Sequence, residues 1–235
     1  MKKITSVAAL ALRLTWVRVV GLFALVGAAQ WLAFVTKFDV TRALEYQIDD
    51  LPAFIGKLGA LALMLLLYVS VQGGKGGKTA YTLRRLSVSE WTVTAVWSLA
   101  FAGYFVMYWL FQIGMVLGMY GQYASQMGGG NRLFLVAYRS SWFHYLMPLA
   151  EPWGYVRNIA LVLGFGSAAA LGGQNGRNGR WNPLCMGIVM IFACVVLMPR
   201  EMASEGLDIT MVIFAVVCTV VDWVWSWRWM HDEAD

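Results

Sequence analysis

Long, nearly uncharged apolar runs are the feature that most limits how this chain can fold. The run 91–123 contains no Asp, Glu, Lys or Arg, and the run 54–71 contains only Lys57. Apolar residues make up 60% of the 235-residue chain and charged residues only 13%, about half of the roughly 25% usual in a soluble domain. A water-soluble protein of this length could not bury that much apolar surface. We therefore predict an all-α integral membrane protein with a single transmembrane domain over residues 1–235.

The lengths of the apolar runs predict six transmembrane helices of about 20 residues each, joined by short loops. The predicted spans are residues 17–36, 54–71, 91–123, 155–173, 181–198 and 209–227. As one helix, the third run would be about 50 Å long at 1.5 Å per residue, which exceeds the roughly 30 Å hydrocarbon core. We expect it to tilt, to project beyond the membrane, or to break near Gly114, Gly118 or Gly121.

Two segments outside these runs are expected to be helices at the membrane surface. Residues 1–18 place four cations around a short apolar patch, which predicts an amphipathic helix on the inner surface that leads into the first span. Residues 133–150 are apolar and aromatic but contain Arg139, and an arginine at the centre of a span is costly. We expect an outer-surface or re-entrant helix there, ended by Pro148 and Pro152; a seventh crossing is the alternative.

Positive charge gives the expected orientation. The segment 73–90 lies between two long apolar runs, and its four cations are opposed by one acid, Glu90. By the positive-inside rule this segment is cytoplasmic, which places both termini in the cytoplasm as well. The lack of an organelle address favours a bacterial cell membrane. In this topology eleven of the eighteen cations fall on the inner side: Lys2, Lys3, Arg13, Arg18, Lys75, Lys78, Arg84, Arg85, Arg177, Arg180 and Arg228.

The net charge of +5 does not by itself indicate a nucleic-acid partner. The cations lie in loops, where orientation in the lipid bilayer explains them more simply. We therefore expect the bilayer, and no nucleic acid, as the surroundings of this chain.

Small residues are concentrated in the fourth predicted span. Gly164, Gly166 and Ser167 are followed by the three alanines 168–170. Small side chains let two helix backbones approach closely in a membrane. We expect a neighbouring helix to pack tightly here.

Few residues suggest chemistry. The stretch GGKGGKT at 73–79 resembles the end of a phosphate-binding loop, but Gln72 stands where the first glycine is needed, and a membrane helix precedes it instead of a strand. A basic loop is the favoured interpretation. His144 and His231 are expected on opposite sides of the membrane, so they cannot share a metal within one chain. The cysteines lie in apolar runs without metal-ligand spacing: Cys185, Cys194 and Cys218.

No catalytic motif is evident, so we expect no catalytic residue, cofactor site or metal site in this chain. Asp222 is the lone acid well inside the sixth predicted span, and intramembrane acids are commonly functional. It is a candidate proton or cation site, and neutralisation by an arginine of another inner segment is the alternative. Glu45, Asp49 and Asp50 fall near one helix face in a short outer loop, where we expect them to be solvated.

The segment before the third span resembles part of a known transporter family. Residues 82–89, TLRRLSVS, are similar to the cytoplasmic segment between spans two and three of type-two ABC transporter permeases. There a leucine pair and a small residue precede a serine at the third span. An N-terminal surface helix, six spans and the lack of a soluble domain also look like that family, and residues 143–159 resemble its small permeases.

The resemblance implies that this chain does not hydrolyse ATP and that a separate ATPase subunit does. Residues 81–89 would form a coupling helix in a groove of the ATPase subunit. Leu83 and Leu86 would be apolar anchors, and Arg84 and Arg85 would meet acidic residues. The implied coupling residues are Tyr81, Leu83, Arg84, Arg85, Leu86, Ser87 and Ser89. ATP and Mg would bind to the ATPase, expected in two copies, and a second permease subunit, identical or diverged, would complete the transport path.

The function expected from this resemblance is the permease subunit of an ABC exporter that moves a peptide, a lipid or another amphipathic substrate. Two alternatives belong to different classes. One is an ATP-independent secondary carrier or channel that uses Asp222. The other is a non-transporting membrane scaffold.

Overall fold

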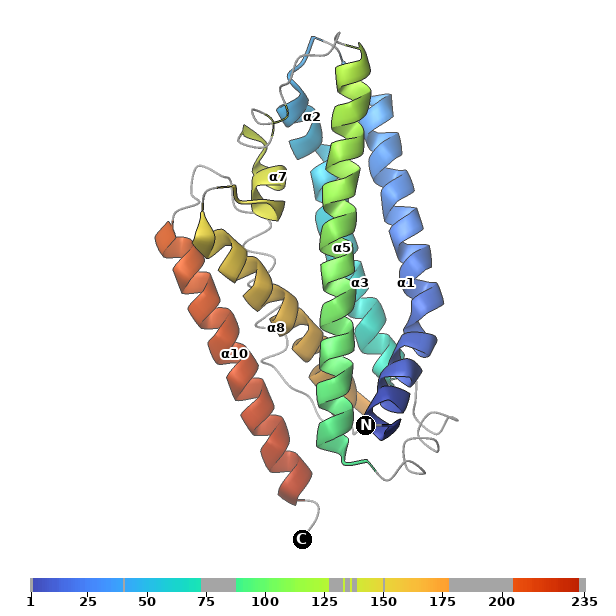
Figure 1. The fold of residues 1–235 in the computed structure, drawn as a ribbon, viewed down its shortest axis with the longest axis vertical. Coiled ribbons are helices and arrows are strands. Elements are labelled where there is room, and N and C mark those ends of the chain that lie inside the picture. The colour runs from blue at the N-terminus through green and yellow to red at the C-terminus, as the bar shows by residue number, and fades with distance from the viewer. Residues whose placement is uncertain are drawn as a thin grey trace.

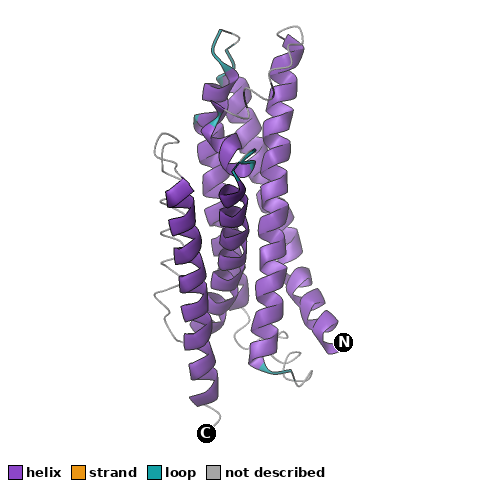
Figure 2. Cartoon of the chain, turned by 60° about the vertical axis from the view of Figure 1, so that its left-hand side comes forward, coloured by secondary structure: helices purple, strands orange, loops and turns teal. Residues whose placement is uncertain are grey.

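The computed structural model describes residues 2–39, 41–72, 88–126, 133, 136, 139–149, 151–177 and 205–232. Within these ranges the chain is a bundle of α-helices, and Figure 2 draws no strand in them. The helices shown in Figure 1 are α1 (Lys2–Thr36), α2 (Leu44–Asp49), α3 (Leu51–Gln72), α5 (Glu90–Gln126), α7 (Ser141–Leu146), α8 (Pro152–Arg177) and α10 (Glu205–Asp232).

Among the described residues, five helices are long and apolar enough to cross a membrane: α1, α3, α5, α8 and α10. Their length and composition make the chain a multi-pass, all-α membrane protein, as the apolar runs predict. The fifth predicted span, 181–198, lies outside the described residues.

The predicted surface helix and the first predicted span form one continuous helix, α1. Its first turns lean away from the axis of the remainder (Figure 1). Thr15 Oγ1 donates to the carbonyl oxygen of Ala11 at 2.9 Å, a contact of the kind that bends helices, and lies 2.9 Å from Tyr104 Oη on α5. Arg13 and Arg18 are both exposed on this helix.

The third predicted span is also one unbroken helix, so of the three outcomes expected for it, a break near Gly114, Gly118 or Gly121 does not occur in α5. A Cβ atom added at Gly114 or Gly121 would meet nothing within 4 Å, so neither glycine is needed for close packing. An isolated glycine lowers helix stability by about 1 kcal/mol relative to alanine, which is too little to break a helix that packs along its length. The 37 residues of α5 span about 55 Å at 1.5 Å per residue, so α5 must tilt or project.

Polar side chains connect α1, α3 and α5. Gln30 on α1 and Gln112 on α5 exchange hydrogen bonds of 2.9 and 3.0 Å, and Gln30 Nε2 also donates to the carbonyl of Pro52 at 2.9 Å. Tyr108 donates to the carbonyl of Gly56 on α3 at 2.6 Å. A Cβ at Gly56 would lie 2.6 Å from Gln112 Oε1 and 2.7 Å from Gln30 Nε2, so the amide pair requires glycine at this position.

The small residues of the fourth span allow the close approach predicted for them. A Cβ added at Gly166 of α8 would lie 2.6 Å from the backbone nitrogen of Ala102 and 2.6 Å from the carbonyl oxygen of Ser98, both on α5. The alanines 168–170 are fully buried beside it. Backbone atoms cannot move aside as a flexible side chain can, so Gly166 fixes the distance between α5 and α8.

Helices α8 and α10 run in the same direction. Arg157 pairs with Asp208 near their beginnings, and Asn175 donates to Ser226 near their ends. Both pairs are separated by 51 residues in sequence, so the two helices keep one register along their contact. The end of α8 and the beginning of α10 consequently lie at opposite ends of the bundle (Figure 1).

The region around residues 133–150 contains the short helix α7. The carboxylate of Asp49 accepts hydrogen bonds from Ser140 Oγ at 2.7 Å, from the Ser141 amide at 2.7 Å and from the Trp142 amide at 3.0 Å, so it binds the start of α7. Pro152 does not end a helix here, because it is the first residue of α8. Proline suits this place, where its missing N–H is not needed by the helix.

Candidate functional site

Most of the predicted coupling segment lies outside the described residues. This holds for Tyr81, Leu83, Arg84, Arg85, Leu86 and Ser87. Ser89 is described and exposed; its Oγ accepts a 3.3 Å hydrogen bond from the Thr92 amide and so caps the start of α5. The flanks of the segment, at the end of α3 and the start of α5, lie at the same end of the bundle as both chain termini (Figure 1).

Asp222 lies on the buried stripe of α10, with 0% of its surface exposed. The stripe contains Asp208, Met211, Ala215, Cys218, Asp222 and Ser226, a three- and four-residue spacing that forms one helix face. Since α10 packs mainly against α8, this face is directed into the bundle. The structure therefore places Asp222 inside the protein and away from lipid.

The acids of the segment 45–50, which was predicted to be a solvated outer loop, are less solvated than their sequence position suggests. Glu45 is 6% exposed and lies 3.6 Å from the exposed Arg139, and Asp49 caps α7. Asp50 forms an exposed ion pair with Arg42 at 2.8 Å. The expectation of a solvated face is thus wrong for Glu45 and Asp49, because α7 folds back over α2.

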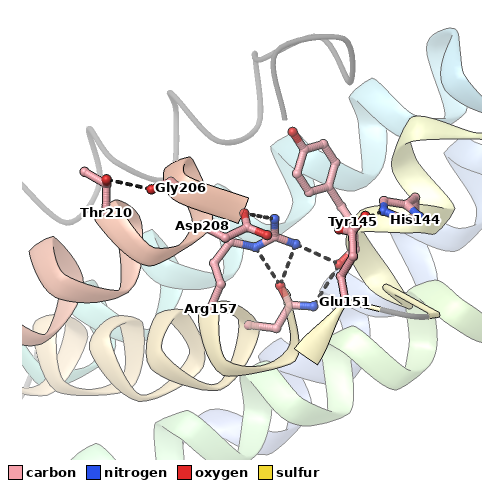
Figure 3. Close-up of polar contacts among 8 residues, drawn as sticks. His144, Tyr145, Glu151, Arg157, Gly206, Asp208 and Thr210 are labelled. Carbon is pink, nitrogen blue, oxygen red and sulfur yellow. Dashed lines mark hydrogen bonds and ion pairs between the residues drawn. The ribbon is translucent and has the colours of Figure 1, made fainter. Parts of the chain in front are cut away.

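The strongest polar cluster is built around Arg157 and Asp208 and lies beside α7, which carries Tyr145 and His144 (Figure 3). Arg157 Nη1 lies 2.7 Å from Asp208 Oδ1, and the two side chains are only 4% and 6% exposed. The guanidinium carbon lies 4.7 Å from the centroid of the Tyr145 ring, and Asn158 donates to the carbonyl of Tyr145 at 2.8 Å. The cluster therefore joins α7, α8 and α10.

Tyr145 and His144 extend this cluster into α7. Burial raises the pKa of the Tyr145 phenol, while Arg157 acts in the opposite direction, so the phenol stays protonated at neutral pH. His144 Nε2 lies 3.2 Å from Glu151 Oε2 (Figure 3). This contact joins α7 to the residue that precedes α8. His231 lies at the far end of α10, so the two histidines are separated as predicted.

A cavity of about 110 Å³ lies beside the cluster, between α3, α5, α7 and α8. Its wall is mainly apolar and aromatic, and its polar residues come from all four helices. The lining residues are Lys57, Ala60, Phe105, Tyr108, Trp109, Gln112, Trp142, Tyr145, Leu146, Arg157, Asn158, Leu161, Val162 and Phe165. Within the described part of the chain, no group of three His, Cys, Asp or Glu residues could hold a metal ion.

The sequence did not reveal the pairing of Arg157 with Asp208. In the sequence, Arg157 is a charge near the edge of the predicted span 155–173. Asp208 is one of the acids just before the predicted span 209–227. One signal in the sequence was available: Arg157 lies among apolar residues in a predicted span. An arginine in that position faces the bundle interior and needs an acidic partner. Which acid it pairs with could not be predicted over a separation of 51 residues.

No known family model, no curated protein and no solved structure matches this chain. The fold class and the buried clusters therefore carry the functional argument.

Proposed function

We propose that this chain is the membrane-spanning permease subunit of an ABC exporter, with six spans and both termini in the cytoplasm. Residues 81–89, within the basic segment 73–90, would dock on a separate ATPase, and the substrate would be a peptide, a lipid or another amphipathic molecule. ATP and Mg would bind in the ATPase partner, and a second permease would complete the transport path.

The observation that carries this proposal is where α3 ends and α5 begins. Arg18 donates to Ser70 at 3.3 Å near the end of α3, and Trp91 at the start of α5 contacts Trp223 near the end of α10, with ring centroids 4.5 Å apart. The end of α3 and the start of α5, which flank the basic segment, lie at the end of the bundle that also holds both termini (Figure 1). A basic segment at that end, next to cytoplasmic termini, suits a docking site for a cytoplasmic partner.

The parallel arrangement of α8 and α10 supports the sixth span. Two membrane-crossing helices that run in the same direction need a connection that returns across the membrane. The intervening residues 178–204 include the apolar run 181–198, which has enough residues to cross the roughly 30 Å hydrocarbon core. Six crossings also place the two termini on one side.

Movement of the docking segment would be transmitted through α3 and α5. These helices are joined by the hydrogen bond from Tyr108 to the Gly56 carbonyl, and α5 is joined to α1 by the Gln30–Gln112 pair. Gly166 holds α8 against the backbone of α5. A force applied between α3 and α5 would thus reach α1 and α8 through packed or hydrogen-bonded contacts.

Co-purification in mild detergent tests the proposal. A tagged chain from its native host should retain a stoichiometric ATPase of about 25–35 kDa, the size of one or two ordinary domains. The double variant Leu83→Glu, Leu86→Glu should retain at least tenfold less, while the matched control Leu83→Met, Leu86→Met keeps both anchors apolar and should retain the ATPase. Equal retention by the glutamate variant and wild type, or recovery of the chain without any ATPase, contradicts the proposal.

Thiol labelling in intact cells tests the orientation separately. In a background with the three native cysteines replaced by serine or alanine, Lys78→Cys should be protected from a membrane-impermeant maleimide. Thr41→Cys, in the exposed turn between α1 and α2, should be labelled. Labelling of the first and protection of the second would invert the topology and remove the docking site.

The burial of Asp222 favours one second candidate, an ATP-independent carrier coupled to protons or cations. A fully buried acid in a membrane-spanning helix is a common site for such coupling. In proteoliposomes without any ATPase, a proton gradient should then drive uptake or release of substrate, and Asp222→Asn should abolish it. Transport that needs ATP and a partner, and that survives Asp222→Asn, supports the exporter instead.

A further inference from the structure

The arginines at the two ends of the bundle differ in their partners. Three arginines near α2, near α7 or at the start of α8 are each ion-paired with an acid: Arg42, Arg139 and Arg157. The other three whose side chains the structure describes belong to the end that holds both chain termini, and no described acid forms an ion pair with them: Arg13, Arg18 and Arg228. Their charges are open to an anion from the surroundings of the chain.

Arg18 reaches the end of α3. Its Nη1 donates to Ser70 Oγ at 3.3 Å, near the last residue of α3, Gln72. Serine is neutral, so this hydrogen bond positions the guanidinium group and leaves its charge unopposed. The basic segment 73–90 follows α3 directly in the sequence and adds four cations against one acid. Arg18 therefore lies at the most positive end of the bundle.

The surface of α1 between Arg13 and Arg18 is apolar. At about 100° per residue, positions 14 and 17 lie between positions 13 and 18 around the helix, and Leu14 and Val17 are both exposed. Trp16 is exposed as well, and tryptophan is enriched where a membrane meets water. Exposed apolar side chains on a membrane-spanning helix contact lipid. The two guanidinium groups therefore adjoin lipid at the level of the head groups.

Phospholipid head groups supply an anion that suits these arginines. A phosphate can accept two parallel hydrogen bonds from one guanidinium group in a charge-assisted pair. Phosphatidylcholine carries a cation beside its phosphate, whereas phosphatidylglycerol does not. Each arginine near a membrane surface strengthens the binding of anionic lipid roughly fivefold.

We propose that Arg13 and Arg18 bind the phosphates of anionic phospholipids, whose acyl chains lie on the exposed Leu14 and Val17 between them. The apolar surroundings favour a lipid over an acidic protein surface as the source of the anion. The site selects anionic lipid at the end of the bundle that holds both termini (Figure 1). The proposal concerns α1 and the bilayer, so it does not depend on docking to an ATPase.

Fluorescence quenching at a single position tests the proposal. In a background without the native cysteines, Val17→Cys carries a bimane label, and the purified chain is placed in phosphatidylcholine nanodiscs. A minor fraction of either brominated phosphatidylglycerol or brominated phosphatidylcholine is included. Quenching at equal mole fraction reports how much of that lipid lies beside the label. We expect the anionic lipid to be favoured about fivefold near residue 17.

Variants assign this preference to the two arginines. Arg13→Gln combined with Arg18→Gln should remove it, while Arg13→Lys combined with Arg18→Lys keeps both charges and should retain it. A label at Val220→Cys is the matched control, because Val220 is exposed and the nearest cation in α10 is more than two turns away. It should show no preference. Millimolar inorganic phosphate should not change the preference near residue 17, which separates a lipid head group from a free phosphate.

The proposal is overturned if the two lipids quench the label near residue 17 equally in the wild-type chain; the arginines would then be open to an acidic protein partner. It is also overturned if the double glutamine variant keeps the preference, or if inorganic phosphate abolishes it. If the cysteine-free chain is not recovered as a folded protein, the phosphatidylglycerol retained per chain after detergent purification decides instead. The double glutamine variant should then retain less than wild type, and equal retention overturns the proposal.

Discussion

Gln30 and Gln112 form a reciprocal amide pair, in which each side chain donates to the other across the contact between α1 and α5. Gln30 is 2% exposed and Gln112 is 1% exposed, so neither amide can turn to water when its partner is lost. The pair is also held against α3, because Gln30 donates to the carbonyl of Pro52.

Replacing one member of this pair should destabilise the bundle. We expect Gln112→Leu to lower the free energy of unfolding by about 1–2 kcal/mol, because it leaves the Gln30 amide partly unsatisfied in an apolar interior. Unfolding by denaturing detergent, followed by circular dichroism, measures this. The double variant Gln30→Leu, Gln112→Leu should cost less than the sum of the two single variants. Strict additivity would show that the two amides do not act as a pair.

Gly166 should be far more sensitive to alanine than the exposed glycines of α5. Gly166→Ala forces a Cβ against backbone atoms of Ala102 and Ser98, and overpacking of this kind typically costs about 1–3 kcal/mol. Gly103→Ala and Gly114→Ala are matched controls, since a Cβ at either position meets nothing within 4 Å. Alanine favours the helix there by roughly 0.5–1 kcal/mol, so both controls should melt at or above the wild-type temperature. A tolerated Gly166→Ala would mean that α5 and α8 are not in close contact.

Breaking the buried ion pair should cost much more than breaking an exposed one. Arg157→Met leaves Asp208 charged and buried, for which a loss of about 3–5 kcal/mol is typical. Arg42→Met breaks the pair with Asp50, whose side chains are about half exposed, and should cost at most about 1 kcal/mol. Thermal unfolding in one detergent compares the two.

A double variant separates the desolvation of the lone charge from the loss of packing. Arg157→Met combined with Asp208→Leu removes both charges and should recover most of the stability lost in Arg157→Met alone. No recovery would indicate that Arg157 acts mainly through its contacts with Tyr145 and Asn158.

Asp49 should control the order of α7 without affecting the rest of the bundle. Asp49→Ala removes the acceptor of the Ser141 and Trp142 amides, and loss of a helix cap typically costs about 0.5–2 kcal/mol. Hydrogen exchange read by mass spectrometry should show faster exchange for peptides that contain residues 141–146, with unchanged exchange in α5. Unchanged exchange in α7 would contradict the capping role.

Composition and the long apolar runs were sufficient to predict an all-α membrane protein and the approximate positions of the spans in α1, α3, α5, α8 and α10, because a membrane-spanning helix needs a long apolar run that is visible in the sequence. Composition and apolar run length did not predict the ends of helices that are longer than the predicted span, such as α1 and α5. The apolar run of α5 includes glycines at which a break was one of the three expected outcomes, yet the helix continues and packs against both α1 and α8.

The candidate sites were harder to predict because they depend on pairs that are distant in sequence. Asp49 and α7 are about 90 residues apart, with no local pattern that connects them. Asp222 was recognisable because a single acid in an apolar run stands out by itself. The predicted docking residues 81–87 lie outside the described residues and stay a prediction.

The two polar links between α8 and α10 limit how these helices can move. Each link is 18 residues from the other along both helices, 157 to 175 and 208 to 226, which is about 27 Å at 1.5 Å per residue. Sliding one helix past the other by a turn would break a contact at both ends at once, one of them a buried ion pair. In any rearrangement of the protein, α8 and α10 should therefore move together as one rigid body. We do not expect a substrate path to open and close between these two helices.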